Sequence, residues 1–439
     1  MTHRFVYTPT PEEMPKTADV IVIGGGPAGA GVVWALERAQ PGIQTVLIEA
    51  GDQLAAGSSL ASLENFRTCW SARCLAAQMT RSVEIMLHAD EYFGEGSAQA
   101  LSVRQRGYLF CALNESQADF YRREVQYLHT IGLNHIEYLE TNEVQKRFGW
   151  LGKALIGAKF DPSAGWIDSN ALVYRMVKSA PSATVLLGVK NVRLLLKGET
   201  VEGVSTSVGT ISAPKVVIAA GANAILIAKN AGLKLPLVIR PRQSFTSAWR
   251  HETYPEDGPM VIGSAPYPHI RPEANQGAIM GWEYSWNTKN ALPGEPVRDH
   301  LLEPIEPIEA LRDPRFPSLG MLLFMRQFKH TPGEGFGDPR YLRGRHNIGY
   351  YVYRDATAAY STAPDGSKRP YDSERAILDA YPGVKGLYLS IAHSGHGIMA
   401  APSAGEVVAA KVLNRPLPDP IFADFGIDVP WVEHDENAL

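Results

Sequence analysis

An apolar run that ends in glycines constrains the fold of this chain more than any other feature. Residues 18–23 form a largely β-branched stretch that is typical of a buried strand. Gly24, Gly26 and Gly29 then follow the G-x-G-x-x-G spacing. In that pattern the first glycine makes a tight turn, the second lets the backbone approach a diphosphate, and the third lets a helix pack on the strand. Residues 30–39 can form that helix, so the sequence predicts a strand–turn–helix unit that binds a dinucleotide.

Glu49 stands where such a unit binds a ribose. A second apolar run at residues 44–48 follows the predicted helix, and Glu49 comes 20 residues after Gly29. This is the offset expected for an acid that accepts hydrogen bonds from ribose hydroxyls. A carboxylate there also repels a 2′-phosphate, so FAD or NAD is favoured over NADP. The alternative is an ordinary βαβ unit with a glycine-rich turn.

The composition argues against several classes of protein. With 439 residues and 45% hydrophobic side chains, the chain is long enough for two or three domains. The formal net charge of −4 and the lack of a basic stripe give no reason to expect a nucleic-acid partner. Cys69, Cys74 and Cys111 have neither a zinc-site spacing nor that of a disulfide framework, which indicates free thiols. The N-terminal residues lack a secretory pattern, so we expect a soluble cytoplasmic protein, with a peripheral membrane contact left open.

The predicted elements indicate a mixed α/β fold. A Rossmann-like FAD-binding domain with a parallel sheet is interrupted by a mainly antiparallel substrate domain, rich in proline and aromatic residues. We expect an exposed arm over residues 1–17. The expected parts that follow are FAD-binding residues 18–95, a helical substrate-side segment 96–150, FAD-binding residues 151–235, the substrate or cap domain 236–365, FAD-binding residues 366–415 and a tail 416–439.

Three later segments complete the expected cofactor site. Residues 51–59 form a small-residue loop that can cross a cofactor face, and strands at residues 215–219 and 386–391 each lead to a glycine-containing turn. A helix after the second turn would place its positive end near the cofactor. The residues expected to contact the cofactor are Gly24, Gly26, Pro27, Ala28, Gly29, Glu49, Ala50, Ser58, Ser59, Val192, Ala220, Gly221, Gly395, His396, Gly397, Ile398 and Met399.

These motifs, taken in order, resemble those of the FAD-dependent amine oxidoreductases that include glycine oxidase, sarcosine oxidase and D-amino acid dehydrogenase. The resemblance runs from about residue 18 to residue 413. It rests on the glycine turn with Glu49, the strand at residues 217–222 and the Ser-Gly-His-Gly turn at residues 394–397. Within this superfamily the chain looks most like the dye-linked L-proline dehydrogenase branch. The resemblance implies oxidation of a C–N bond by hydride transfer to flavin N5, with an imine as product.

The resemblance also bears on how the cofactor is held and reoxidised. Some relatives tether FAD through a cysteine near the Ser-Gly-His-Gly turn or through a histidine after the second strand. No cysteine follows Cys111 and residues 51–70 contain no histidine, so we expect non-covalent FAD. Residues 333–337 are glycine-rich but lack the context of a second dinucleotide fingerprint. The organic substrate should therefore reduce the flavin, and oxygen or another carrier should reoxidise it.

Four residues are candidates for the substrate site. An amino or imino acid needs a cation for its carboxylate, and Arg67 and Arg354 both lie among aromatic residues. Either arginine could instead belong to an ordinary ion pair. Tyr360 stands roughly where glycine oxidase-like relatives carry a substrate-binding arginine. His396 belongs chiefly to the turn that shapes the flavin site in the family, with proton transfer as its alternative role.

Three functions stay open at this point. The leading one is oxidation of an amino or secondary amino acid, with L-proline as the first candidate substrate. A 2-hydroxy acid or glycerol phosphate dehydrogenase would share the architecture but need a general base, for which His393 or His396 is the candidate. The third is a flavoprotein subunit of a hetero-oligomer that carries electrons without turnover of its own.

Overall fold

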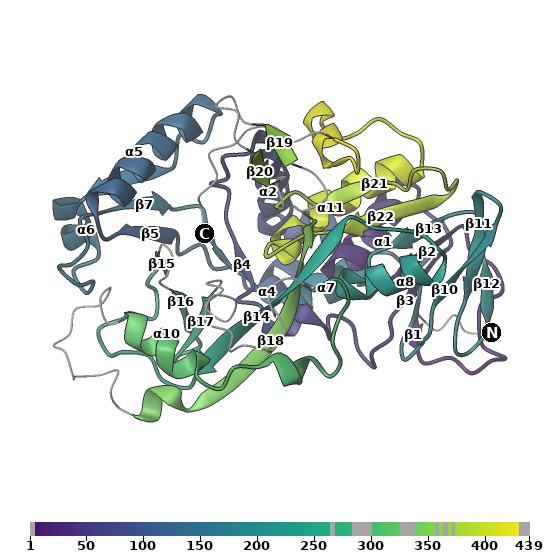
Figure 1. Cartoon of the computed structure of the whole chain (residues 1–439), viewed down its shortest axis with the longest axis horizontal. Coiled ribbons are helices and arrows are strands. Elements are labelled where there is room, and N and C mark those ends of the chain that lie inside the picture. Colours follow the sequence, from purple (N-terminus) through teal and green to yellow (C-terminus); the bar gives the residue numbers. More distant parts are fainter. Residues whose placement is uncertain are drawn as a thin grey trace.

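The structure is a computed structural model, and it describes residues 5–263, 268–282, 301–324, 339–355, 360–362, 368–370 and 374–429. Two large sheets lie toward opposite ends of the long axis of the molecule (Figure 1). The long strands β14 (Leu237–Ser247) and β18 (Gly344–Arg354) form the end of the second sheet that lies in the middle of the molecule. Residues 333–337, the glycine-rich stretch of the sequence analysis, lie outside the described residues.

A seven-stranded sheet forms the first layer. Its neighbouring strands are parallel except for β21, which pairs antiparallel with β22. The predicted parallel sheet of an α/β fold is therefore present. In spatial order the strands are β1 (Val6–Tyr7), β9 (Thr184–Leu186), β3 (Thr45–Ile48), β2 (Val20–Ile23), β13 (Val216–Ile218), β22 (Leu387–Ile391) and β21 (Ile377–Ala380).

Residues 6 and 7 of the expected arm over residues 1–17 join the sheet instead. Val6 and Tyr7 form β1 and pair in parallel with Val185 and Leu186 of β9. The outer edge of β9 offers unpaired backbone groups, and the short N-terminal strand satisfies them.

Alternating side chains of β2 pack on opposite faces of this sheet, as the two-residue period of a strand requires. Val20 and Val22 face the helices, whereas Ile21 and Ile23 face a three-stranded sheet and the helix α8. All four are at most 3% exposed. The helices on the first face are α1 (Pro27–Ala39), α2 (Arg73–Leu87), α7 (Ser169–Lys178) and α11 (Gly397–Val412). The second face is covered by β10 (Arg193–Lys197), β11 (Thr200–Ser205), β12 (Thr210–Ser212) and α8 (Ala224–Asn230).

Helices α1 and α11 approach each other backbone to backbone. A Cβ atom at Gly31 would lie 2.2 Å from the carbonyl oxygen of Ala401, and one at Gly405 would lie 2.1 Å from the carbonyl oxygen of Gly31. Only glycine permits this contact. Helix α11 begins at Gly397, because it follows the turn after β22 directly.

An eight-stranded, mainly antiparallel sheet forms the second layer. In spatial order its strands are β18 (Gly344–Arg354), β14 (Leu237–Ser247), β17 (Gly277–Trp282), β16 (His269–Glu273), β15 (Met260–Gly263), β5 (Tyr108–Ala112), β7 (Gly157–Asp161) and β6 (Glu137–Glu140). Helices α5 (Glu115–Thr130) and α6 (Thr141–Arg147) pack on its β5–β7 end, and α10 (Phe316–Phe324) lies near β16 and β17 (Figure 1).

Two predicted segments differ from this arrangement. The segment 96–150 contains the helices α4 (Ser97–Leu101), α5 and α6, as expected of a helical segment, but it also contributes β5 and β6 to the sheet. Strand β7 also belongs there, although residues from 151 onward were assigned to the FAD-binding part. The reason is the parallel pairing of β15 with β5, which joins strands about 150 residues apart and leaves no local signature in the sequence.

Shorter elements connect these layers. They are the helices α3 (Ala89–Phe93) and α4 (Ser97–Leu101), the strand pairs β4 (Asn65–Phe66) with β8 (Gly165–Trp166) and β19 (Tyr360–Thr362) with β20 (Lys368–Pro370), and the 3₁₀ turns Ser58–Ala61, Gly221–Asn223, Ile308–Leu311, Pro339–Leu342 and Pro420–Phe425. In the described part of the chain, none of the helices combines the length and apolar character needed to cross a membrane.

Candidate active site

The glycine turn between β2 and α1 has the geometry of a diphosphate cradle. Gly24 has φ +115°, and a Cβ atom there would lie 2.4 Å from the carbonyl oxygen of Ala219. A Cβ atom at Gly29 would lie 1.9 Å from the carbonyl oxygen of Gly24, so glycine is required for the helix to pack on the turn. Gly26 instead faces open space, precedes α1 without a side-chain cap, and leaves the helix N-terminus accessible to an anion.

The carboxylate of Glu49 is fixed at the end of β3. Its Oε2 atom accepts a hydrogen bond from the backbone N–H of Gly25 at 2.7 Å, and its Oε1 atom accepts one from Gly51, also at 2.7 Å. The side chain is partly exposed and borders the main cavity of the molecule. Each oxygen retains a second lone pair, so the carboxylate can accept ribose hydroxyls while it holds the turn.

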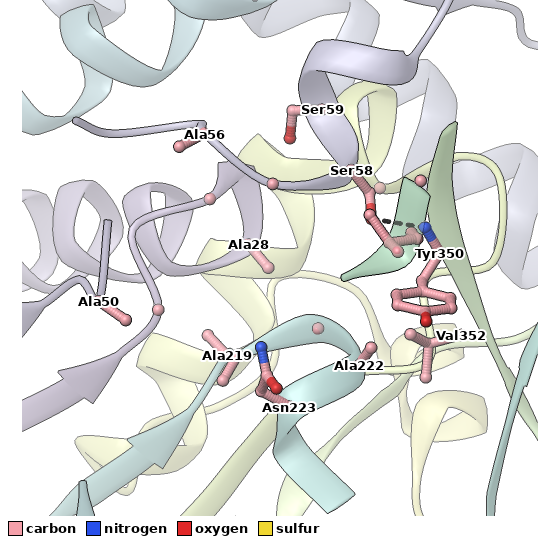
Figure 2. Close-up of a pocket in the computed structure, with 18 of the residues that line it drawn as sticks. Ala28, Ala50, Ala56, Ser58, Ser59, Ala219, Ala222, Asn223, Tyr350 and Val352 are labelled. Atoms are coloured by element: carbon pink, nitrogen blue, oxygen red, sulfur yellow. Dashed lines mark hydrogen bonds between the residues drawn. The ribbon is translucent and has the colours of Figure 1, made fainter. Parts of the chain in front are cut away.

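That main cavity has a volume of about 760 Å³ and runs from the glycine turn to β18. Such a volume lies within the usual range for cofactor sites, about 300–1,000 Å³. Figure 2 shows Ala28, Ser58 and Tyr350 around it, with the backbone N–H of Tyr350 donating to the Ser58 hydroxyl at 2.9 Å. The predicted cofactor residues that line it are Gly24, Gly26, Pro27, Ala28, Glu49, Ala50, Ser58, Ser59, Val192, Ala220, Gly221, Gly395, Gly397 and Ile398.

Three other predicted cofactor residues lie elsewhere. Gly29 sits beneath the turn, where it packs against Gly24. His396 and Met399 face a second, smaller cavity of about 140 Å³. The two cavities are neighbours because Ser62, Tyr351, Gly395 and Ile398 line both of them.

The smaller cavity holds one buried cation. Arg67 is 1% exposed, and its guanidinium carbon lies 3.9 Å from the ring centre of Trp70 and 5.3 Å from that of Phe110. Among the described residues that line this cavity, no other lysine or arginine occurs. An arginine held against aromatic faces in a small cavity is suited to a carboxylate.

Two side chains of β7 fix the loop that carries Arg67. Asp161 is fully buried and accepts hydrogen bonds from the backbone N–H groups of Thr68 at 3.1 Å and Cys69 at 3.2 Å. Two positions earlier, Lys159 pairs with Glu124 at 2.6 Å, with both side chains at most 3% exposed. The loop from residue 67 onward is therefore held by the substrate-side sheet.

Three titratable side chains of the smaller cavity are kept neutral, and the Glu374 carboxylate lines the same cavity. Burial lowers the pKa of His396 to about 3, with His393 and Arg67 adding to the effect. Burial and Arg67 lower the pKa of His269 to about 4. Burial also raises the pKa of the Cys69 thiol to about 12, which leaves it protonated and a poor nucleophile.

Residues 19–320 match the family model described as FAD dependent oxidoreductase, abbreviated DAO. The chain belongs to this family. It is 23% identical over 446 residues to the FAD-dependent oxidoreductase domain-containing protein 1 homolog of Drosophila melanogaster. The matched region covers 92% of this chain and 77% of that protein. It is 26% identical over 281 residues to glycine oxidase of Geobacillus kaustophilus, across 62% of this chain and 64% of the relative.

Solved structures share the fold. The crystal structure of L-proline dehydrogenase from P. horikoshii superposes with a TM-score of 0.73 at 21% identity, covering 94% of this chain and 98% of that one. The resemblance to FAD-dependent amine oxidoreductases and the α/β fold class, both stated from the sequence, are thus confirmed.

The residues of this DAO-family chain fit FAD. The anion-accepting N-terminus of α1 follows Gly26, which leaves space for a diphosphate, and Glu49 is placed for a ribose. Sequence reasoning missed Asn191 and Asn223, which also line the main cavity. Asn191 adopts φ +56°, a conformation that asparagine tolerates better than most residues, but the sequence carries no clear signal for it.

The structure separates the two candidate arginines. Arg354 is 2% exposed and does not line the smaller cavity. Its guanidinium donates, at 2.8–3.5 Å, to the backbone carbonyls of Arg375, Ala376, Phe425, Gly426 and Ile427. It therefore joins chain segments instead of facing a substrate. Tyr360 lies in β19, paired with Pro370 of β20, and its side chain is outside the described residues.

Proposed function

We propose that this FAD-dependent oxidoreductase oxidises the C–N bond of an amino acid or secondary amino acid, with L-proline as the leading substrate and an imine as product. The observation that carries the proposal is the small cavity beside the cofactor cavity, in which Arg67 is buried against the ring of Trp70. A buried arginine of this kind can pair with a carboxylate through two parallel hydrogen bonds.

The walls of the cavity suit the amine end of such a substrate. Trp70, Met399 and the neutral ring of His396 line it, so an amine there is largely desolvated. Desolvation lowers the pKa of an amine and favours the neutral form, whose lone pair assists loss of hydride from the α-carbon. The C–H bond breaks with its electron pair, the C=N bond forms, and the nitrogen gives up a proton. Bound FAD supplies the two-electron acceptor for this step.

The size of the cavity and the relatives support a small substrate. A volume of about 140 Å³ suits proline, glycine or an N-methylated glycine better than an amino acid with a large aromatic side chain. Glycine oxidase and L-proline dehydrogenase, which act on molecules of that size by their names, are among the similar proteins.

We further propose that oxygen or a carrier protein reoxidises the flavin, with a hetero-oligomeric contact as one way to reach a carrier. The three cysteines are free and buried. Free thiols support a reducing compartment such as the cytoplasm.

Anaerobic reduction of the flavin tests the proposal. The holoenzyme is mixed with L-proline, glycine, sarcosine, pyrrolidine, lactate and glycerol 3-phosphate, and the flavin absorbance is followed. We expect bleaching by at least one amino acid and much slower bleaching by pyrrolidine, which lacks the carboxylate. Bleaching by the hydroxy compounds alone would indicate the hydroxy acid dehydrogenase reaction, and no bleaching by any compound would indicate an electron-carrying subunit.

Acid precipitation tests how FAD is bound. Because the thiol of Cys69 is protonated and no cysteine follows Cys111, we expect FAD without a covalent link. The supernatant should be yellow and the protein pellet colourless. A yellow pellet contradicts this expectation.

A further inference from the structure

His396 carries a buried ring nitrogen that has no hydrogen-bond partner among the described residues. The side chain is 2% exposed and lines the smaller cavity, and the nitrogen in question is Nε2. Buried polar atoms are nearly always paired in folded proteins. An unpaired one beside a cavity therefore points to a group on the ligand that occupies the cavity.

The opposite nitrogen, Nδ1, lies against two acceptors. The Ser394 hydroxyl donates to the Oε2 atom of Glu374 at 2.8 Å, and the Ser394 oxygen lies 3.3 Å from Nδ1 of His396. The Glu374 Oε2 atom itself lies 3.8 Å from Nδ1. A serine hydroxyl has one hydrogen, which here points to the carboxylate. Its oxygen therefore faces Nδ1 as an acceptor, and Nδ1 must carry the ring hydrogen.

This hydrogen bond fixes the role of the other nitrogen. A neutral imidazole has one N–H, so hydrogen on Nδ1 leaves a lone pair on Nε2. The ring is also held by Trp70, with ring centres 4.9 Å apart in an edge-to-face arrangement. The smaller cavity thus presents a fixed acceptor at Nε2 together with a fixed cation at Arg67.

We propose that Nε2 of His396 accepts a hydrogen bond from the N–H of the substrate amine, and that Ser394 and Glu374 are positioning residues that set the tautomer required for this. The inference rests on the proposed function, because it needs an amino acid in the smaller cavity. Arg67 then binds the carboxylate and His396 binds the amine, so the cavity recognises both polar ends of the substrate.

The charges around His396 determine whether its ring accepts a hydrogen bond from the substrate amine or takes a proton from it. The groups that influence the ring are Arg67, His393 and Glu374. Burial, His393 and Arg67 lower the pKa of His396 to about 3, and a backbone hydrogen bond to Glu374, which raises the pKa, is outweighed. A base of that strength cannot hold an amine proton near pH 7, so His396 acts as a neutral hydrogen-bond acceptor.

A matched pair of probes tests the inference. 2-Methylproline has a carboxylate and an N–H but no hydrogen on its α-carbon, so it cannot lose hydride there. 2-Methyltetrahydrofuran-2-carboxylate replaces the N–H with an ether oxygen. Binding of each probe to the holoenzyme is measured by calorimetry and by the perturbation of flavin absorbance. We expect wild type to prefer the N–H probe by about tenfold or more, the range for a buried hydrogen bond whose loss leaves an unpaired acceptor.

Three variants show which residues produce the preference for the N–H probe. His396→Phe keeps an aromatic ring beside Trp70 but has no acceptor, so the preference should fall below about threefold. Ser394→Ala removes the acceptor facing Nδ1 and should narrow the preference as well. Ser390→Ala is the matched control, since the buried Ser390 hydroxyl lies 3.3 Å from the neighbouring His393 instead. It should retain the wild-type preference, and the flavin content of each variant checks its folding.

The outcomes separate the inference from the function on which it rests. If His396→Phe and Ser394→Ala both keep the full preference, the role of His396 is overturned while the proposed substrate class stands. If wild type binds neither probe, the proposal that the substrate is a proline-like secondary amino acid fails, and the inference fails with it. A preference that stays constant from pH 5 to pH 8 supports a neutral acceptor, and one that disappears as the pH falls below about 6.5 contradicts it.

Discussion

The guanidinium carbon of Arg67 lies 3.9 Å from the centre of the Trp70 ring. Both side chains are at most 5% exposed, and both line the smaller cavity. A charge at this depth is stable only where its surroundings compensate for lost hydration. The aromatic face contributes part of this compensation, and a bound carboxylate would contribute more.

Replacing Arg67 with Met tests its role as the carboxylate partner. The methionine preserves an apolar contact with Trp70 but cannot pair with an anion. We expect kcat/KM for L-proline to fall by the equivalent of about 2–5 kcal/mol, the range for breaking a desolvated charge pair. Steady-state kinetics with pyrrolidine provide the control, because a substrate without the carboxylate should lose much less. An equal loss for both compounds would argue for a general structural effect.

Arg354→Met separates a structural arginine from a substrate-binding one. The guanidinium of Arg354 bridges β18 to the segments around Ala376 and Gly426. Its removal leaves several buried carbonyls without donors, so the free energy of unfolding should fall by about 2–4 kcal/mol. Denaturant unfolding measures this loss. The ratio of proline to pyrrolidine activity should remain that of wild type, and a collapse of that ratio would restore Arg354 as a carboxylate partner.

The two arginines also show where sequence reasoning succeeds and where it stops. Arg67 and Arg354 both stand among aromatic residues, and the sequence favours Arg67 only slightly, because its loop follows the ribose-binding strand. Their roles differ because the guanidinium of Arg354 meets carbonyls about 20 and 70 residues further along the chain. Contacts between distant segments are set by the tertiary fold and leave no pattern near either residue.

The cofactor side was more readily predicted, because its features are local. Gly24, Gly29 and Glu49 fall within a short stretch, and their spacing alone implies a turn, a close helix contact and a carboxylate at the strand end. The small cavity has no such stretch. The sequence did not indicate His269 or Asp161. His269, in a strand of the second sheet, lines the cavity, and Asp161, in another strand of that sheet, holds the loop that carries Arg67.

Glu49→Gln should weaken FAD binding. The carboxylate accepts backbone N–H groups of Gly25 and Gly51 through separate oxygens, whereas glutamine has one oxygen and would turn an N–H toward a donor. We expect the Kd for FAD to rise by about 10- to 100-fold. Fluorescence of released FAD on dilution measures the change. Glu37→Gln is the control, because that carboxylate also accepts a backbone N–H, from Gly42 at 3.0 Å, but lies outside the cofactor cavity.

Stability should decline in mild acid because of three histidines whose pKa values are lowered in the folded protein. Burial lowers the pKa of His269 and His393 to about 4 and, with added charge effects, that of His396 to about 3. In the unfolded chain these groups take up protons as the pH falls through about 6.5, whereas the folded protein stays unprotonated. The unfolded state then binds more protons, so stability is lost as the pH falls from about 6.5 toward 4.

The expected slope is about 1.4 kcal/mol per pH unit for each histidine. Denaturant unfolding of the holoenzyme at pH 7, 6 and 5, with constant FAD, measures it. His396→Phe should lessen the slope by up to one histidine's share. A free energy of unfolding that does not change over this range would show that the histidines are already protonated in the folded state or are solvated there.

Asp161→Asn should impair substrate binding without any contact between residue 161 and the substrate. The carboxylate accepts the backbone N–H groups of Thr68 and Cys69, which follow Arg67 directly, and the Ser163 hydroxyl at 2.6 Å. An amide retains one acceptor oxygen and presents an N–H where a donor already points, so the loop should loosen. We expect KM for L-proline to rise by about tenfold or more, with FAD content unchanged and pyrrolidine turnover little affected. Combined with Arg67→Met, the substitution should add almost nothing to the loss for proline, because the guanidinium it positions is gone. Fully additive losses would show that Asp161 acts on the fold as a whole and not through Arg67.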